Sequence, residues 1–283
     1  TPRATPHGYG HGRPRSCVAM KQAAGKAVVK GGGFGAKAAK PKKRAPVVKL
    51  DPWVQGELDE LAQGEQSIEA YLNPKLFEDP ATMEDISKQL KAGEVVVLRE
   101  AFRPEFAEMV FAELSCKNVN WELNEAYFED GYHHRHHNVY DRSSWSKRLN
   151  ATFAMMAAPA SQNFVEKLTG RDCSGETQGA PSWYKSGDHS LPHTDWVGQR
   201  TVSYVWHLSK DWQPEWGGAL YWAQHDHAVA TYPASFNTLV LFSVTTRSAH
   251  FVTTVSPHHK GKRLTYNGWW QSSWVPAAQD DLE

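Results

Sequence analysis

Residues 184–195 have the sequence Tyr-Lys-Ser-Gly-Asp-His-Ser-Leu-Pro-His-Thr-Asp, which ends in a histidine and an aspartate two positions apart. The range Leu191–Trp196 is predicted to be a β-strand, so His193 and Asp195 should project from the same face of it. The Cα atoms of residues i and i+2 in a strand lie about 6.5 Å apart. Both side chains are therefore expected to reach a single metal ion.

An imidazole beside a carboxylate is a mixed ligand set. One further histidine would complete the two-histidine, one-carboxylate arrangement that binds non-haem Fe(II) and leaves coordination positions open. The chain contains 14 histidines, and a single His-x-Asp pair often occurs by chance. The third ligand therefore has to be sought in the surrounding sequence.

Short stretches rich in β-branched and aromatic residues alternate with turn residues from about residue 180 onward. Strands at this spacing indicate a β-sandwich or a barrel. Besides the strand that carries His193, the expected strands are Thr201–Leu208, Ala219–Ala223, Ala228–Tyr232, Thr238–Val244, Phe251–Val255 and Leu264–Trp270.

The preceding region, residues 51–179, has a mostly helical pattern. A capping-box-like start predicts a helix over Thr82–Ala92, and Arg103–Leu114 is amphipathic. Glu94–Leu98 is an apolar run that predicts a buried strand between the two helices. The predicted fold is mainly β with flanking helices (α+β), in one domain over 51–283 with a helical part, 51–179, and a β core, 180–275.

Residues 1–50 are rich in Gly, Ala, Pro and Lys and contain 12 basic residues and no acidic one. Because this composition can bury little apolar surface, the segment is predicted to be a disordered tail. The basic cluster at 40–44 fits a nuclear address, a nucleic-acid contact, part of an organelle-targeting peptide or simply a solvated tail. The other residues include 19 basic and 31 acidic ones, a net charge of −12. Nucleic-acid binding is therefore expected only through the tail.

The three cysteines are few and far apart, which argues against a disulfide framework and against a cysteine-based zinc site. An intracellular location, cytoplasmic or nuclear, is expected, with organelle targeting by the tail as the alternative. No apolar run reaches the roughly 18 residues that a membrane helix needs, so no membrane contact is expected. The sequence carries no signal for an oligomeric state.

Several features follow one another in order between Trp183 and Trp270. They are Tyr184-x-x-Gly187-Asp188, His193-x-Asp195, Gly217-Gly218-x-Leu220, His250, and Arg263 in a strand ending in Trp269-Trp270. This series resembles the prolyl-4-hydroxylase-like branch of the Fe(II)/2-oxoglutarate-dependent dioxygenase superfamily. The resemblance implies a double-stranded β-helix (jelly-roll or cupin-like) core with iron at one mouth of the barrel.

Matched position by position, the resemblance implies that His193, Asp195 and His250 are the metal ligands. It assigns Arg263 to the far carboxylate of 2-oxoglutarate, a role that suits a planar guanidinium. No catalytic residue beyond the metal ligands is implied. The other implied co-substrate contacts are Tyr184, Thr265 and His207, the last where some relatives have a tyrosine.

The resemblance also implies Fe(II), 2-oxoglutarate and O₂, with ascorbate as reductant and with succinate and CO₂ as products. It favours hydroxylation of a prolyl residue in a protein or peptide. The alternatives are hydroxylation of a free amino acid or another small molecule, and a non-catalytic cupin-like binding protein. A binding protein would be expected to have lost a ligand or the arginine, and this chain retains all four.

Other histidines invite rival interpretations. The cluster His133–His137 is predicted to be a mobile, solvated loop near the active-site entrance that contacts substrate, rather than a metal site of its own. His225-Asp226-His227 is predicted to form a hairpin turn between two strands. His258 and His259 lie too close to Arg263 in sequence to supply the third ligand in this architecture.

Overall fold

The computed structural model describes residue 56, residues 67–224 and residues 228–276. The predicted tail, 1–50, and the His225–His227 turn lie outside the described residues. No helix among the residues that are described is long and apolar enough to cross a membrane.

The helices precede most of the strands, as predicted. The predicted helix near Thr82 begins slightly earlier, at Pro80, because the Asp79 side chain accepts a hydrogen bond from the Ala81 N–H and caps it. The helices and 3₁₀ turns are α2 Ile68–Tyr71, η1 Pro74–Phe77, α3 Pro80–Lys91, α4 Pro104–Ser115, η2 Arg142–Ser144, α5 Lys147–Ala157, α6 Pro159–Thr169 and η3 Pro214–Trp216.

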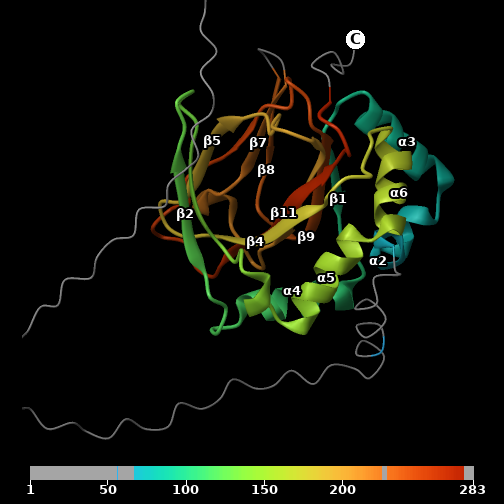
Figure 1. Cartoon of the computed structure of the whole chain (residues 1–283). Coiled ribbons are helices and arrows are strands. Elements are labelled where there is room, and N and C mark those ends of the chain that lie inside the picture. Colours follow the sequence, from blue (N-terminus) through green and yellow to red (C-terminus); the bar gives the residue numbers. More distant parts are fainter. Residues whose placement is uncertain (1–55, 57–66, 225–227, 277–283) are drawn as a thin grey trace, which may run out of the picture. The chain divides into compact units, whose positions relative to one another are not determined.

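The strands form one antiparallel sheet in the order β1-β9-β6-β11-β4-β3-β5-β10-β7-β8, and β2 pairs with β3. In Figure 1, helices α3 and α6 lie at the right of the strands, and β2, itself a strand of the sheet, lies at the left. The strands are β1 Val96–Arg99, β2 Glu122–Tyr127, β3 His133–Asn138, β4 Gln178–Tyr184, β5 His189–His193, β6 Arg200–Leu208, β7 Leu220–Gln224, β8 Ala228–Tyr232, β9 Phe236–Ser243, β10 His250–Val252 and β11 Arg263–Gln271.

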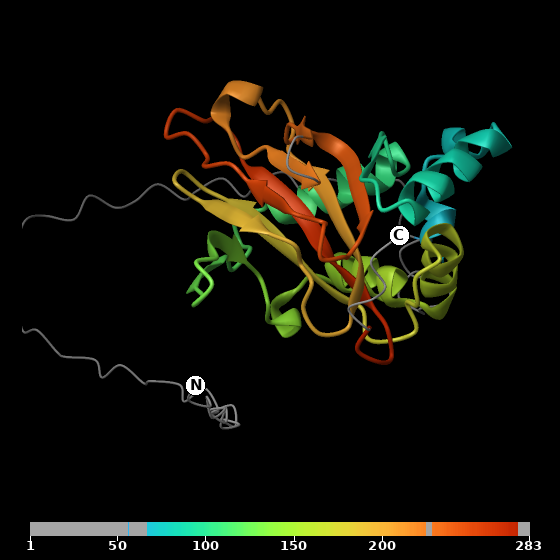
Figure 2. The same ribbon diagram turned by 90° about the horizontal axis from the view of Figure 1, so that it is seen from above.

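The central strands bury both faces, so alternate residues belong to two separate cores. In β9, Leu239 and Leu241 pack toward the helices, whereas Val240 and Phe242 face the barrel interior. The helices stay together beside the sheet when the molecule is turned (Figure 2). The residues of β6 and β11 that share the helix-side core are Val202, Tyr204, Trp206, Leu208, Leu264, Tyr266 and Trp270. The interleaved positions, which face the barrel interior, include Ser203, His207, Arg263, Thr265 and Trp269.

The predicted fold class is confirmed: the sheet is curled, mostly C-terminal and flanked by helices. The expected strands from residue 200 onward are all present, with ends shifted by up to three residues. The hairpin between β7 and β8 is present, with Leu220 paired to Tyr232 and Gln224 paired to Ala228.

The expected loop at His133–His137 is wrong. These residues form most of β3, which pairs with β2 along its length and joins β4 to β5. The range 51–179 therefore contains the β2–β3 hairpin in addition to the one strand expected there, which is present as β1. The sequence of β3, HHRHHN, has no alternation of apolar and polar residues to signal a strand.

Candidate metal centre

His193, Asp195 and His250 converge at one end of the strand pair β5–β10. His250 is the register partner of His193, and their ring centroids are 4.3 Å apart. The Nε2 atoms of His193 and His250 lie 3.4 and 3.5 Å from the Asp195 carboxylate oxygens. One ligand atom from each residue lies within 4.8 Å of the others, a spacing that could hold a metal ion.

The backbone conformation that brings His193 and Asp195 together differs from the predicted continuous strand. Strand β5 ends at His193, so Asp195 is not in a strand, and its φ is +62°. Aspartate tolerates this left-handed conformation better than most residues. Between the pairs His250–His193 and Val252–Ser190, β5 carries one residue more than β10. Such a bulge re-aims side chains, and here it turns His193 inward.

Backbone carbonyls fix the orientation of both imidazoles. The Nδ1 of His193 donates to the Leu191 carbonyl at 2.8 Å, and that of His250 donates to the Ser248 carbonyl at 2.9 Å. The Nε2 atoms are thus left as lone-pair donors directed at the same point. Burial lowers the pKa of His250 to about 4, so its imidazole is neutral at neutral pH.

Hydrogen-bond donors surround the Asp195 carboxylate. The Trp269 Nε1–H donates to it at 2.9 Å, and the Ser203 hydroxyl donates at 3.3 Å. Arg200 lies 3.7 Å away and stacks on the Trp269 ring at 3.6 Å. Burial alone would raise the pKa of Asp195, but His250, His193 and the Trp269 N–H hold it well below its usual range. The carboxylate is therefore ionised and held in one orientation.

These three partners of Asp195 were not predicted. Ser203 and Trp269 share an interior face with His207 and Arg263, so the alternation of side chains along a strand could have identified them from the sequence. No sequence signal pointed to the Arg200 contact.

Arg263 is a buried cation without an anionic partner among the described residues. Its side chain is 1% exposed, its Nε donates to the Gly218 carbonyl at 3.0 Å, and its Nη2 has no partner. The guanidinium lies over the Tyr184 ring at 4.3 Å from the centroid. Burial lowers the pKa of Arg263 to about 10, which still leaves it protonated at neutral pH. A buried charge of this kind needs a counter-ion.

The Gly217-Gly218 pair has a structural explanation. Both residues have positive φ, of 70° and 68°. A Cβ at Gly218 would also lie 3.2 Å from the Arg263 side chain and 3.1 Å from that of Val255. Glycine therefore allows the backbone to approach the arginine and to accept its hydrogen bond.

Two neutral imidazoles flank Arg263. His207, register partner of Thr265, is fully buried, and neither ring nitrogen has a partner among the described residues. His136 stacks on Tyr184 at 5.0 Å and accepts from the Asn124 amide at its Nε2, so its proton lies on Nδ1, which also lacks a partner. Burial lowers the pKa of both histidines, and the charge of Arg263 lowers both further.

The residues present fit iron and a carboxylate ligand. Two imidazoles and one carboxylate form the ligand set expected for non-haem Fe(II). Around Arg263, the unpaired donors require an acceptor, and a carboxylate has only acceptors to offer. Thr265 is the exception among the predicted contacts, because its hydroxyl already donates to the Asn267 side chain at 3.1 Å.

Residues 180–271 match the protein family described as the 2OG-Fe(II) oxygenase superfamily. The chain carries a 2OG-Fe(II) oxygenase domain. This oxygenase domain contains the three triad residues and Arg263, and the family implies Fe(II) and 2-oxoglutarate as cofactor and co-substrate. The recognition made from the ordered motifs is thus confirmed, whereas the use of ascorbate stays a prediction.

A curated relative of the oxygenase domain is prolyl 3,4-dihydroxylase OGFOD1 of Ostreococcus tauri. It is 33% identical over 127 residues, which are 41% of this chain and 24% of that protein. The chain therefore spans about a quarter of the length of this relative.

Two solved structures share the fold of the oxygenase. The prolyl-4-hydroxylase of Pseudomonas putida is 18% identical with a TM-score of 0.53, over 67% of this chain and 98% of that one. A prolyl hydroxylase of Trichoplax adhaerens, solved with a peptide of hypoxia-inducible factor, is 13% identical with a TM-score of 0.50, over 79% and 94%. At these identities, the likeness shows the fold alone.

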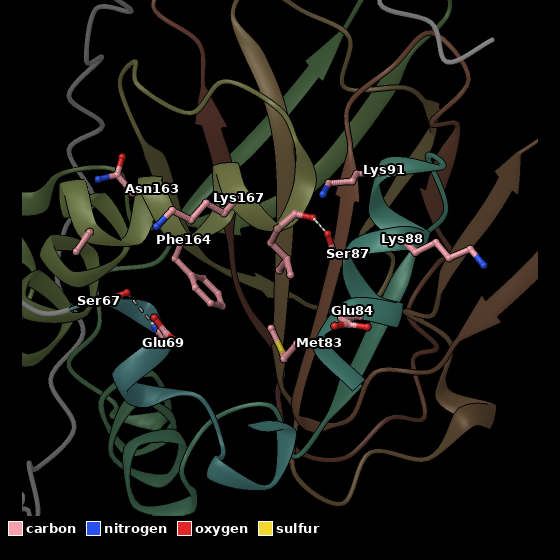
Figure 3. A pocket seen from close by; sticks show the side chains of 12 residues that line it. Ser67, Glu69, Met83, Glu84, Ser87, Lys88, Lys91, Asn163, Phe164 and Lys167 are labelled. Carbon is pink, nitrogen blue, oxygen red and sulfur yellow. Dashed lines mark hydrogen bonds between the residues drawn. The ribbon is translucent and has the colours of Figure 1, made fainter. Parts of the chain in front are cut away.

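The helical layer contains a separate cavity (Figure 3). It lies between α2, α3 and α6 and is lined by apolar side chains such as Met83 and Phe164 and by charged ones such as Lys88 and Lys167. None of the predicted site residues lines it. His259 does not join the cluster of candidate metal ligands among the described residues, and its ring lies 5.4 Å from that of Trp212.

Proposed function

We propose that this chain is an Fe(II)- and 2-oxoglutarate-dependent hydroxylase that acts on a prolyl residue of a protein or peptide. His193, Asp195 and His250 would hold the iron, and Arg263 would pair with the far carboxylate of 2-oxoglutarate. The reaction would release succinate and CO₂ together with the hydroxylated product.

The observation that carries this proposal is the buried Arg263, which lies on the interior face that also supplies Ser203 and Trp269, the hydrogen-bond donors to Asp195 of the triad. A metal site alone would have no use for an arginine at 1% exposure. A binding protein without co-substrate would have to tolerate an unpaired buried cation, which is costly. A dicarboxylate that contacts both the metal and Arg263 accounts for both features.

Different side chains of the site would have different roles in this reaction. Arg263, flanked by His207, His136 and Tyr184, would orient the co-substrate through its carboxylate. Iron, when bound, would supply the activation of O₂ that couples decarboxylation of 2-oxoglutarate to oxidation of a C–H bond. Asp195 would occupy a metal position that the halogenases of this superfamily leave to chloride, and this favours hydroxylation.

Aromatic side chains help to keep water out of the metal centre. The His250 ring packs against Phe242 at 4.9 Å and lies parallel to Trp222 at 6.2 Å. A dry site strengthens the electrostatic contacts of the bound groups.

The preference for a prolyl substrate rests on the name of the relative from Ostreococcus tauri and on the motif series. The test is incubation with Fe(II), ascorbate, 2-oxoglutarate and proline-containing peptides, followed by mass spectrometry. We expect a product heavier by one oxygen atom, located on proline, together with stoichiometric succinate. An oxidised free amino acid, with no oxidised peptide, would contradict the prolyl assignment, and absence of succinate would contradict the oxygenase itself.

A further inference from the structure

Strand β3 has two unlike faces. On its outer face, His133 lies 2.9 Å from a ring nitrogen of His189, and His137 lies 2.9 Å from the Asp188 carboxylate. On its inner face are His134 and His136. Three of the four ring nitrogens of these inner histidines are buried without a partner among the described residues. The outer histidines are thus explained by the fold, and the inner ones are not.

The two inner histidines face different parts of the site. His136 lies against Tyr184 and is influenced by Arg263, so it belongs to the co-substrate pocket. His134 pairs in register with Ser190 of β5, the strand that ends in His193. The Tyr132 ring lies 5.5 Å from His134 and 4.6 Å from His193. His134 is therefore part of the wall next to the triad.

His134 offers one donor and one acceptor to a ligand. Burial lowers the pKa of His134, and the neighbouring His193 and His133 lower it further, so the imidazole is neutral. A neutral imidazole donates through one nitrogen and accepts through the other. Since both nitrogens are unpaired, a carboxylate or phosphate would satisfy only the donor.

The geometry of an imidazole further limits which ligands can bond to both of its nitrogens. Its two nitrogens point away from each other, so one small polar group cannot bond to both. An extended peptide presents a donor and an acceptor at every residue other than proline and can meet both nitrogens as it passes the ring. We propose that His134 binds the main chain of a peptide substrate and positions one of its residues beside the triad. This inference rests on the proposed function and adds how the substrate is held.

The surface around the site fits a polypeptide better than a free amino acid. Phe128, which stacks on Tyr132 at 5.2 Å, is 50% exposed, and Tyr140, bonded to Asn124, is 57% exposed. Exposed apolar side chains close to one another mark binding surfaces for macromolecules. Two further exposed apolar residues lie two positions from triad residues in the chain: Leu191 before His193 and Val197 after Asp195.

The test compares three variants with the wild type on short synthetic peptides, each with one central proline, and on free L-proline. His134→Phe keeps a planar ring without hydrogen-bonding atoms, and His134→Asn keeps a donor and an acceptor. His133→Phe is the matched control, because it is the adjacent residue on the outer face. Succinate and oxidised product are measured against peptide and 2-oxoglutarate concentrations.

We expect His134→Phe to raise the KM for the peptide about tenfold or more, as for the loss of a buried hydrogen bond. Its KM for 2-oxoglutarate should change less. His134→Asn should recover part of the loss, and His133→Phe should match the wild type. A wild-type peptide KM in His134→Phe, or no recovery in His134→Asn, would overturn the inference.

Other outcomes separate this inference from the proposed function. If the wild type oxidises the peptide and His134→Phe does so with an unchanged KM, the proposed function holds and only this inference is refuted. If the wild type forms succinate but oxidises only free L-proline, the oxygenase assignment holds, and the prolyl-peptide assignment and peptide binding by His134 are both refuted. If the wild type consumes no 2-oxoglutarate under any condition, the proposed function fails and this inference fails with it.

Discussion

Among single residues, Arg263 separates a 2-oxoglutarate enzyme from a generic metal site. It is held by one backbone hydrogen bond and one aromatic ring, and its Nη2 has no partner among the described residues. A cation so placed contributes little to folding, because its desolvation is not repaid within the chain. The free-energy cost of burying this cation is offset only if a ligand supplies the anion.

Replacing Arg263 with alanine should raise the KM for 2-oxoglutarate strongly. Truncation of one partner of a desolvated charge pair costs roughly 2–5 kcal/mol. That loss corresponds to an increase of about 30-fold or more in KM. The measurement is a 2-oxoglutarate titration of succinate formation beside an iron titration, in which affinity should barely change.

Lys262→Ala is the matched control for this prediction. Lys262 is the neighbouring cation, but its Nζ lies 3.3 and 3.4 Å from carbonyls at the end of α4 and 4.7 Å from the Trp183 ring. Its substitution should leave the KM for 2-oxoglutarate unchanged. An unchanged KM in Arg263→Ala together with a raised KM in Lys262→Ala would reverse the assignment.

Each triad residue is predicted to be required for iron binding. Alanine at position 193, 195 or 250 should lower iron-dependent turnover by about 100-fold or more, exceeding the effect of losing residues that only support ligands. Circular dichroism should show a folded domain. His258→Ala, in the turn before β11, serves as control, and full activity in His250→Ala with loss in His258→Ala would move the third ligand.

At this scale, the sequence predicted residue types and missed backbone geometry. The spacing of His193 and Asp195 indicated a shared ion, and the two side chains do converge. The reason given, a continuous strand, was wrong, because a bulge and a positive φ at Asp195 bring them together. The bulge depends on pairing with β10, a contact between distant segments that local spacing does not encode.

Among the elements, β3 was the hardest to predict. Strands such as β9 carry apolar residues on both faces, and their composition alone indicates a strand. Strand β3 has polar side chains on both faces, and its partners on each side decide its conformation. Its histidines indicated a loop in isolation, although two of them, His134 and His136, lie on the inner face of the strand beside the candidate site.

A pH prediction follows from His136 in β3. Burial, followed by His134 and Arg263, lowers its pKa in the folded state to about 3, from an ordinary value of 6.5. The unfolded chain therefore binds more protons between these values, and stability falls as pH falls below about 6.5. From pH 7 to pH 5, His136 alone should lower the free energy of unfolding by about 2 kcal/mol.

The measurement is denaturant unfolding of chelator-treated protein at pH 7 and pH 5. His136→Phe keeps a ring that can stack on Tyr184 and removes the titrating group, so it should lose less stability than the wild type over this interval. His133→Phe, on the outer face, should leave the difference close to that of the wild type. An equal loss in His136→Phe and the wild type would show that His136 is not buried as a neutral group.

For the whole molecule, the net charge of zero is the sum of a basic N-terminal segment and an acidic remainder. Residues 1–50 carry 12 basic and no acidic residues, and the other residues carry a net charge of −12. The oxygenase fold was predictable because its motifs and strands follow a fixed order over the C-terminal half. The tail contains no such series of motifs, so the prediction that it is disordered rests on its composition alone.

Deleting residues 1–50 should leave substrate-free 2-oxoglutarate turnover and the melting temperature nearly unchanged. The tail composition has few large apolar side chains, so it has little to add to either hydrophobic core.

The same deletion should abolish any retention on nucleic acid. In the full chain this retention should weaken steeply with added salt, because lysine and arginine contacts to phosphate release counter-ions. The measurements are succinate formation, a thermal melt and a salt titration of binding to generic RNA, each on both proteins. A chain in which the lysines and arginines of residues 1–50 are replaced by glutamine is the control, and it should behave like the deletion in the binding assay. A melting temperature several degrees lower in the deletion, but not in the glutamine variant, would show that the tail packs on the oxygenase domain through its apolar residues.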